Sequence, residues 1–199
     1  ARAPCLTGAT WRDLTGKYSG TLTSVPQRQQ SHGRPGGQAS LFFDGTDDIV
    51  SVADDAVWNG GQSYMTWAAW LRPTVSDTTQ RSWIMKGDYG TADQWSYTLQ
   101  WTPTFGNVRV FIASAGSDVG NNLVDSSGGS IAANVWVHVC VVFDGTQAAA
   151  GDRLRIYRNG TLLSGAMSGT IPTTIKDHAS THPLRFGTFQ GLGRFFIGQ

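Results

Sequence analysis

The chain has 199 residues, 40% of them hydrophobic, and a formal net charge of +1. This length and apolar content are sufficient for one domain with a core. The small charge, with no run of basic residues, gives no electrostatic footprint for nucleic acid. No apolar run approaches the roughly 18 to 20 residues needed to span a bilayer, so we expect neither a nucleic-acid partner nor membrane insertion.

The acidic and basic residues point to a sheet protein. All 14 acidic residues are aspartate, and three lysines accompany twelve arginines. Glutamate and lysine favour exposed helix faces, whereas aspartate and glycine favour turns. This inventory, together with 25 glycines, argues against a sizeable helical layer.

In the N-terminal half the pattern predicts short strands separated by turns. A loop from Asp13 precedes a short strand over residues 20–23, and a polar, Gly- and Pro-containing exposed loop is expected over residues 25–37. Two strands at residues 40–45 and 48–52 flank a turn that carries three aspartates. A long strand over residues 64–73, with aromatics on both faces, ends at a proline and is a predicted core strand.

The same pattern continues to the end of the chain. Further short strands are expected, separated by Gly, Pro, Asn and Asp clusters. They lie at residues 83–87, 96–101, 107–113, 129–132, 169–171, 183–187 and 194–199.

Residues 134–160 contain two strands and the connection between them. Residues 136–143 are nearly all β-branched or aromatic, which predicts a strand buried on both faces. Residues 152–158 alternate apolar and charged side chains and predict a half-exposed strand. Asn159-Gly160 tolerates positive φ and predicts a two-residue hairpin turn, with Thr161 to Leu163 returning from it.

These elements predict an all-β fold, an antiparallel two-sheet sandwich of jelly-roll type, over residues 1–199 as a single domain. At least ten short strands are expected and no helix. The side chains expected to be buried are Trp67, Trp70, Val139, Val141 and Phe143.

Seven stretches, in order, resemble the laminin-G-like members of the concanavalin A-like jelly rolls, which are related in fold to pentraxins and legume lectins. They are residues 13–22, 41–50, 65–73, 84–88, 136–145, 154–160 and 183–187. The resemblance covers almost the whole chain and implies this fold. It implies a function less specifically, because the family serves many binding and structural roles.

The chain also differs from the family that it resembles in two ways. Relatives begin with a further strand and end with another one after the Phe-Phe-x-Gly stretch, so the chain is expected to lack a terminal strand at each end and to be an excerpt of a longer one. We therefore expect that Ala1 to Leu6 or Arg194 to Gln199 lies against polypeptide outside this sequence, with possible assembly through terminal strands. Where relatives carry cation-binding residues after Asp13, this chain has Lys17, Tyr18 and Ser19.

Aromatic residues in one strand form the candidate ligand-binding site. In the stretch from Trp95 to Trp101 the pattern places Trp95, Tyr97, Leu99 and Trp101 on one face. Such a face can stack on sugar rings, and the ligand-binding candidates are Trp95, Tyr97 and Trp101. Core packing explains the same pattern.

Aspartates in turns form the candidate metal site. Asp44, Asp47 and Asp48 lie within five residues, and Asp13 belongs to another turn. Carboxylate oxygens from such loops suit Ca²⁺, so one calcium ion is a candidate cofactor. The alternative is that each aspartate caps its own turn without a metal.

Nothing in the sequence requires an enzyme. Without glutamate the paired glutamates of related glucanases are absent, and no strand carries aspartates at alternate positions. His178 and His182 lie in a predicted loop, where solvation is favoured over zinc, and His138 is expected to be a hydrogen-bonded, part-buried ring. No serine or cysteine nucleophile motif is present.

Two smaller features keep their alternatives open. Cys5 and Cys140 could pair or stay reduced, and Asn159-Gly160-Thr161 reads as a glycosylation acceptor or as the hairpin turn.

Two functions therefore remain. One is a non-catalytic recognition module, extracellular or on a cell or virion surface, that binds glycan or mediates adhesion. The other is a structural or decorating jelly-roll protein, of a virion or a surface filament, that contacts other protein chains.

Overall fold

The computed structural model describes residues 10–24, 26–29, 39–75, 79–87, 95–101, 107–113, 131–177, 182–189 and 193–199, and the backbone of residues 123–126. Within these residues the chain forms strands and one short 3-10 helix, η1 (Ala150–Asp152), and no α-helix. The strands are β1 (Thr10–Arg12), β2 (Ser19–Thr23), β3 (Gln27–Gln29), β4 (Ser40–Asp44), β5 (Ile49–Val52), β6 (Tyr64–Leu71), β7 (Arg81–Gly87), β8 (Trp95–Trp101), β9 (Val108–Ile112), β10 (Leu123–Ser126), β11 (Val137–Asp144), β12 (Leu154–Arg158), β13 (Thr161–Leu162), β14 (Gly165–Ser168), β15 (Leu184–Phe186) and β16 (Ile197–Gly198). No described helix is long and apolar enough to cross a membrane.

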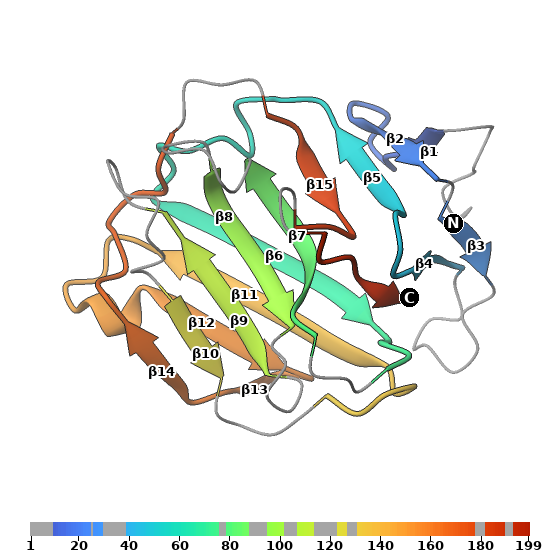
Figure 1. Cartoon of the computed structure of the whole chain (residues 1–199). Helices are drawn as coiled ribbons and strands as arrows, with labels where there is room; N and C mark the ends of the chain where they lie inside the picture. The colour runs from blue at the N-terminus through green and yellow to red at the C-terminus, as the bar shows by residue number, and fades with distance from the viewer. Residues whose placement is uncertain are drawn as a thin grey trace.

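The strands form two layers. A nine-stranded sheet has the order β1-β2-β5-β15-β7-β8-β9-β10-β14, and a four-stranded sheet has the order β13-β12-β11-β6. In Figure 1 strands β7 to β9 lie in front of β6, β11 and β12. A third, small sheet of β16, β4 and β3 lies at the side of the molecule where the chain ends. All pairings between named strands are antiparallel, so the predicted all-β sandwich is confirmed.

The core lies between the two large sheets. Its side chains come from the alternate, inward positions of both layers, as the period of two in a strand requires. They include Val50, Trp67, Leu71, Tyr97, Leu99, Val110, Ile112, Val139, Val141, Phe143 and Ile156. The prediction that Trp67, Val139, Val141 and Phe143 are buried is confirmed.

Two predictions about burial are wrong. Strand β11 alternates buried and partly exposed residues, so one of its faces is covered rather than both. Trp70 is only partly buried, because it lies on the outer face of β6 beside His138, with ring centroids 5.3 Å apart. The strand that is buried on both faces is β8.

Most predicted strands are present, with five differences. The first is β1, which was not predicted. Residues 27–29 of the predicted loop form β3, and Ile131, Ala132 and residues 169–171 are not strands. Strands β10 and β14, which pair with each other, were not predicted because strands of four residues are too short to show a periodic signal. The hairpin between β12 and β13 is confirmed, since Asn159 and Gly160 both have positive φ.

The C-terminal segment finds backbone partners within the chain. Arg72 and Gln199 exchange hydrogen bonds of 2.7 and 3.0 Å, and the amide of Phe196 donates to the carbonyl of Gly187 at 2.8 Å. The expectation that residues 194–199 also lie against other polypeptide stays a prediction. Residues 1–6, the other half of that expectation, lie outside the described residues.

Candidate functional site

A chain of polar side chains runs along the outer face of the nine-stranded sheet. Ser82 and Thr98, on neighbouring strands, share a hydrogen bond of 3.0 Å, and the amide of Gln100 lies 3.4 Å from the Thr98 hydroxyl. Gln80 donates to Gln100, and Arg194 donates to Gln80. Ser82, Thr98 and Gln100 are almost completely buried, so this network is fixed before any ligand arrives.

The polar chain borders a pocket of about 210 Å³, which we call the outer-face pocket. Its lining residues come from β8, β9 and the segments before β7 and after β15. They are Gln80, Trp95, Thr98, Gln100, Arg109, Phe111, Phe189 and Arg194. Three aromatic side chains, two amides and two guanidinium groups therefore meet in one pocket.

Two arginines contribute guanidinium groups to the pocket. Arg109 lies over the ring of Phe111 at 6.0 Å and Arg194 over the ring of Phe189 at 5.6 Å. Each guanidinium group thus rests on an aromatic ring that limits its movement. Both guanidinium groups line the pocket together with the amides of Gln80 and Gln100.

The pocket contains one of the three predicted ligand-binding aromatics. Tyr97 and Trp101 belong to the core between the sheets, as in the core-packing alternative. Trp95 belongs to a second cluster with Met85, Phe111 and other residues of the outer side. The prediction that Trp95 shares a face of β8 with Tyr97 and Trp101 is therefore wrong. The reason is that the pairing of β7 with β8 shifts between Lys86 and Gly87.

The other residues of the pocket were not predicted from the sequence as ligand-binding residues. Arg109, Arg194, Gln80 and Phe189 come from separate segments, and no local pattern connects them. The signal that existed was the polar face of β8, with Ser96, Thr98 and Gln100 at alternate positions in an otherwise aromatic strand.

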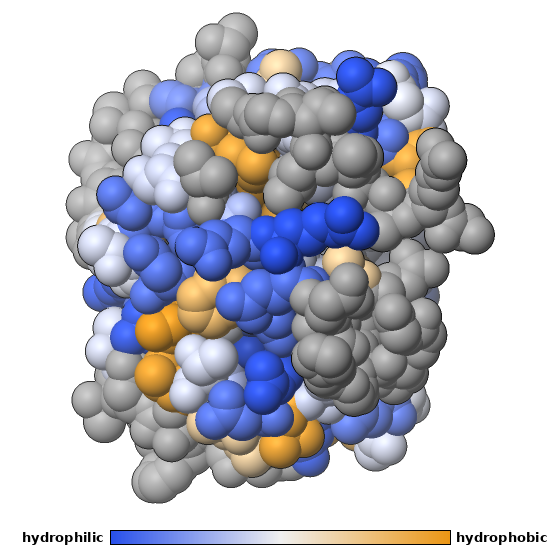
Figure 2. Space-filling view, turned by 90° about the vertical axis from the view of Figure 1, so that its right-hand side faces the viewer, coloured by the Kyte–Doolittle hydropathy of each residue, from blue (hydrophilic) through white to orange (hydrophobic). Residues whose placement is uncertain are grey.

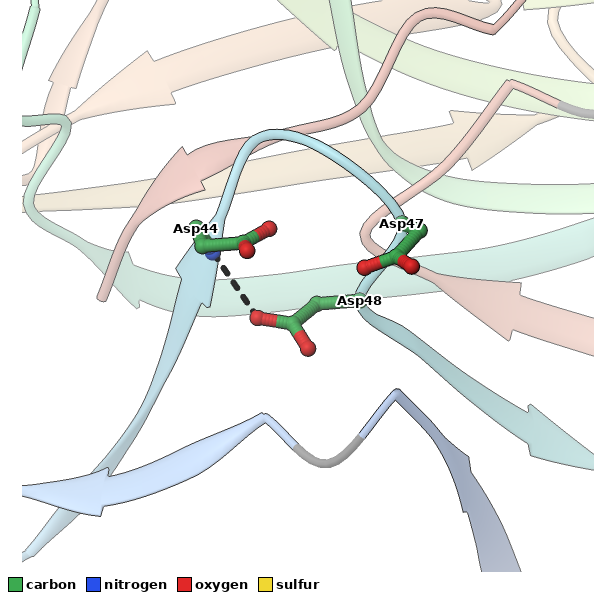
Figure 3. A group of neighbouring side chains, drawn as sticks. All are labelled: Asp44, Asp47 and Asp48. Atoms are coloured by element: carbon green, nitrogen blue, oxygen red, sulfur yellow. Dashed lines mark hydrogen bonds between the residues drawn. The ribbon is translucent and has the colours of Figure 1, made fainter.

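The acidic turn between β4 and β5 brings three predicted metal ligands together. Carboxylate oxygens of Asp44, Asp47 and Asp48 all lie within 4.8 Å of one another. Figure 3 shows Asp44 and Asp47 on opposite sides of the turn, with the Asp48 carboxylate directed toward the backbone of Asp44. Asp48 accepts the Asp44 amide at 2.9 Å, and Asp44 accepts the Thr46 amide at 2.8 Å.

The electrostatics of this turn favour a cation. Burial of Asp48, together with the nearby charges of Asp44 and Asp47, raises the pKa of Asp48, although the Asp44 amide opposes the shift. A bound cation would remove this repulsion. Asp13 is not part of the group: its carboxylate accepts from Thr15 and from the Tyr18 amide, which lowers its pKa and caps its own turn.

The remaining candidates have structural surroundings. His138 packs on Trp70, and the amide of His138 donates to the Asn159 side chain at 2.9 Å, so Asn159 stabilises its hairpin. Cys140 is a free, partly buried thiol. The carbonyl of His182 accepts from Lys86, whereas Cys5 and His178 lie outside the described residues.

One buried ion pair lies at another end of the sheet. Lys86 is fully buried and its ammonium group contacts the carboxylate of Asp54. Burial lowers the pKa of Lys86, and the pairing with Asp54 opposes this shift. This pair could not be predicted from a local pattern, because Lys86 and Asp54 are 32 positions apart in the chain.

Comparison with protein families gives one match. The model of the concanavalin A-like lectin/glucanases superfamily with laminin-G-like members matches residues 44–199, which is more than half of the chain. No curated protein sequence matches the chain.

Solved structures with a similar fold are distant in sequence. The chain superposes on a sialidase from Trypanosoma rangeli, solved with sialic acid, with a TM-score of 0.55 and 14% identity over 98% of this chain and 28% of the sialidase. A heptameric pentraxin from Limulus polyphemus gives a TM-score of 0.46 and 14% identity over 78% of this chain and 74% of the pentraxin. A sialyllactose-bound carbohydrate-binding module from a Ruminococcus gnavus sialidase gives a TM-score of 0.49 and 14% identity over 73% of this chain and 80% of the module. The chain thus spans less than a third of the sialidase, and these likenesses concern the fold.

Proposed function

The chain belongs to the concanavalin A-like lectin/glucanases superfamily, and from this premise we propose that it is a non-catalytic carbohydrate-binding module whose site is the outer-face pocket. The observation that carries the proposal is the combination in this pocket of aromatic side chains with fixed amide and guanidinium donors. Aromatic surface with a few placed polar groups is the usual lining of a small-molecule site. At about 210 Å³ the pocket suits one sugar ring rather than a long chain.

The two arginines favour an acidic sugar. Guanidinium groups bind carboxylates through paired, charge-assisted hydrogen bonds, and Arg109 and Arg194 line the same pocket. The buried indole N–H of Trp95 has no acceptor among the described residues and is available to a sugar oxygen. We therefore assign the pocket to a carboxylated saccharide, such as a uronate or a sialic acid.

The same lining supports the proposal that the module is non-catalytic. Glycoside hydrolysis usually requires two carboxyl groups flanking the bond, about 5 to 10 Å apart. The described lining of the pocket contains none. A module of this kind acts outside a cell or on a particle surface, where glycans are displayed.

The experiment is calorimetric titration of the chain with sialyllactose and galacturonate, against lactose and galactose as neutral counterparts. We expect the acidic sugars to bind and the neutral ones to bind at least tenfold more weakly. Arg194→Met should weaken binding of the acidic sugars about tenfold or more, since one charge-assisted pair is lost. Arg155→Met, on the opposite sheet, is the matched control and should bind normally.

Three results separate the parts of this proposal. Equal binding of acidic and neutral sugars would retain the carbohydrate function and reject the acidic specificity. Binding that Arg194→Met leaves unchanged would place the site elsewhere. No binding to any glycan on an array, with or without chelator, would reject the function.

For the cofactor, we propose one calcium ion at the acidic turn. The carboxylates of Asp44, Asp47 and Asp48 would hold it, and they are the hard oxygen ligands that Ca²⁺ prefers. The buried carboxylate of Asp48 fits this assignment because its raised pKa reflects a charge that lacks compensation. The ion would supply structural stability to the turn that joins β4 to β5.

A second function, a structural protein that contacts other chains, has one observation in its favour. Strand β6 ends its sheet, and no described strand pairs with its outer edge over residues 64–71. Such an edge can accept a strand of another protein chain. Light scattering tests it: a concentration-dependent oligomer without glycan binding would favour this function.

A further inference from the structure

The polar chain beside the outer-face pocket begins at a group that can only donate hydrogen bonds. A guanidinium group has N–H groups and no acceptor, so the Arg194 side chain donates to the carbonyl oxygen of the Gln80 side chain, Oε1. The NH2 group of Gln80 is then left to donate to Oε1 of Gln100. The orientation of one amide therefore decides the orientation of the next.

The polar chain ends at a group that can only accept. The NH2 group of Gln100 lies 3.4 Å from the Thr98 hydroxyl oxygen, and this hydroxyl donates to the backbone carbonyl of Ile84 at 3.2 Å. A backbone carbonyl has no hydrogen to donate. With a donor at one end and an acceptor at the other, every link runs in one direction, from Arg194 to Ile84.

The backbone at Arg194 is held independently of the polar chain. Its carbonyl accepts from the amide of Ser82 at 3.4 Å and from the amide of Phe189 at 3.2 Å. The next residue, Phe195, forms a parallel bridge with Ser82. A change at Gln80 therefore acts on the side chain of Arg194 and leaves the path of its backbone in place.

Two contacts position this side chain. The guanidinium group of Arg194 lies over the Phe189 ring at 5.6 Å and donates to Oε1 of Gln80. The ring attracts the cation to its face, but only the hydrogen bond fixes the direction in which the N–H groups point. Gln80 is partly buried, whereas Gln100 and Thr98, which hold it, are almost completely buried. The direction of Arg194 is thus set from within the sheet, through Gln80.

We infer that Gln80 is the positioning residue of the outer-face pocket: its amide directs the Arg194 guanidinium group toward the anionic group of a ligand and so determines the preference for acidic over neutral sugars. This inference deepens the proposed function and rests on it. Because an amide has no net charge, Gln80 orients Arg194 without neutralising it. A carboxylate in its place would hold Arg194 but would also compensate its charge.

The isosteric change Gln80→Glu tests the need for a neutral amide. It keeps the size of the side chain and the bond to Arg194, and it adds a negative charge that competes with the ligand. We expect the variant to bind galacturonate and sialyllactose at least tenfold more weakly. Its binding of galactose and lactose should change less than twofold.

The matched control is Gln27→Glu, the same change at an exposed residue of β3. Strand β3 lies far from β8 and β9, which line the pocket (Figure 1). It belongs to the side of the molecule that Figure 2 shows, where hydrophilic side chains surround a few hydrophobic patches. This variant should bind all four sugars like the original protein.

Gln80→Met removes the hydrogen bond without adding a charge. We expect it to weaken binding of the acidic sugars about fivefold, the effect of one hydrogen bond, and to leave the neutral sugars unchanged. The two variants of Gln80 thus separate the orientation of Arg194 from its charge.

A second measurement needs no ligand. Nuclear magnetic resonance detects side-chain amides, and those of Gln80 and Gln100 should exchange hydrogen at least tenfold more slowly than that of exposed Gln27. A carboxylate at position 80 has no N–H to donate, so in Gln80→Glu the Gln100 amide must turn to donate to it. Its resonances should therefore move, whereas a residue that only fills space would leave them unchanged.

Three outcomes would overturn the inference. Exchange at Gln80 and Gln100 as fast as at Gln27 would show that the polar chain does not form. Unchanged affinity for acidic sugars in Gln80→Glu, when Arg194→Met weakens it, would show that another group positions Arg194. Equal losses for acidic and neutral sugars would show that the substitution disturbs the whole pocket.

Failure of the proposed function gives a different result. Slow exchange at Gln80 and Gln100 in a protein that binds no glycan would reject the sugar site, and with it the role of Gln80 in sugar preference, while the polar chain itself stands.

Discussion

Asp48 is the only described aspartate that is buried, and its surroundings oppose its charge. Because its pKa is raised in the folded protein, the folded state binds a proton more readily than the unfolded chain does. The stability contributed by the protonated form is present at low pH and is lost as the pH rises through the raised pKa. At neutral pH the ionised carboxylate therefore costs stability unless a cation compensates it.

We predict that Asp48→Asn raises Tm by about 2 to 4 °C at pH 7 without calcium, because the amide oxygen still accepts the Asp44 N–H. The difference should disappear as the pH falls below the raised pKa. Calcium should affect the original protein and the Asp48→Asn variant differently. At ten times its dissociation constant it stabilises the original protein by about 1.4 kcal/mol and leaves the variant unchanged.

Asp144→Asn is the control for this prediction, because Asp144 lies in another turn, where hydrogen bonds from Thr146 and Gln147 lower its pKa. It should keep the full calcium response. If neither calcium nor chelator changes the Tm of the original protein, the three aspartates only cap their turn.

At the residue scale, the sequence predicted only groups of residues that are close together in the chain. Asp44, Asp47 and Asp48 are neighbours in the chain, so their grouping could be foreseen. Arg109 and Arg194 are 85 positions apart by their numbers, and only the fold brings them to one pocket. The side on which Trp95 lies depends on a register shift that no residue of β8 specifies.

At the element scale, the sequence identified strands better than it identified what covers them. The composition of β11 marks a strand, but its outer face stays partly exposed because nothing in the described chain packs on it. The outer face of β8 is buried because the segment after β15 returns across it, with Ser82 donating its amide to Arg194. Burial by a segment that is distant in the chain cannot be predicted from the residues of the strand alone.

The end of β11 provides a prediction at this scale. Gly145 follows β11 directly, and a Cβ at this position would lie 1.8 Å from the carbonyl oxygen of Thr173. Gly145→Ala must therefore displace backbone, and it should lower the free energy of unfolding by about 1 to 3 kcal/mol. Urea denaturation measures this difference.

Gly151→Ala is its matched control, because no atom lies within 4 Å of a Cβ at that position. It should change the free energy of unfolding by less than about 0.5 kcal/mol. Equal losses in both variants would show that the effect comes from chain flexibility and not from the contact with Thr173.

At the scale of the whole molecule, the part of the chain after β15 connects the outer-face pocket to the small sheet. Phe189 and Arg194 line the pocket, and β16 pairs with β4. The amide of Phe189 donates to the carbonyl of Arg194 at 3.2 Å, and the amide of Phe196 donates to that of Gly187 at 2.8 Å. The position of Arg194 in the pocket therefore depends on backbone contacts with several strands of the fold, which no local pattern around Arg194 could predict.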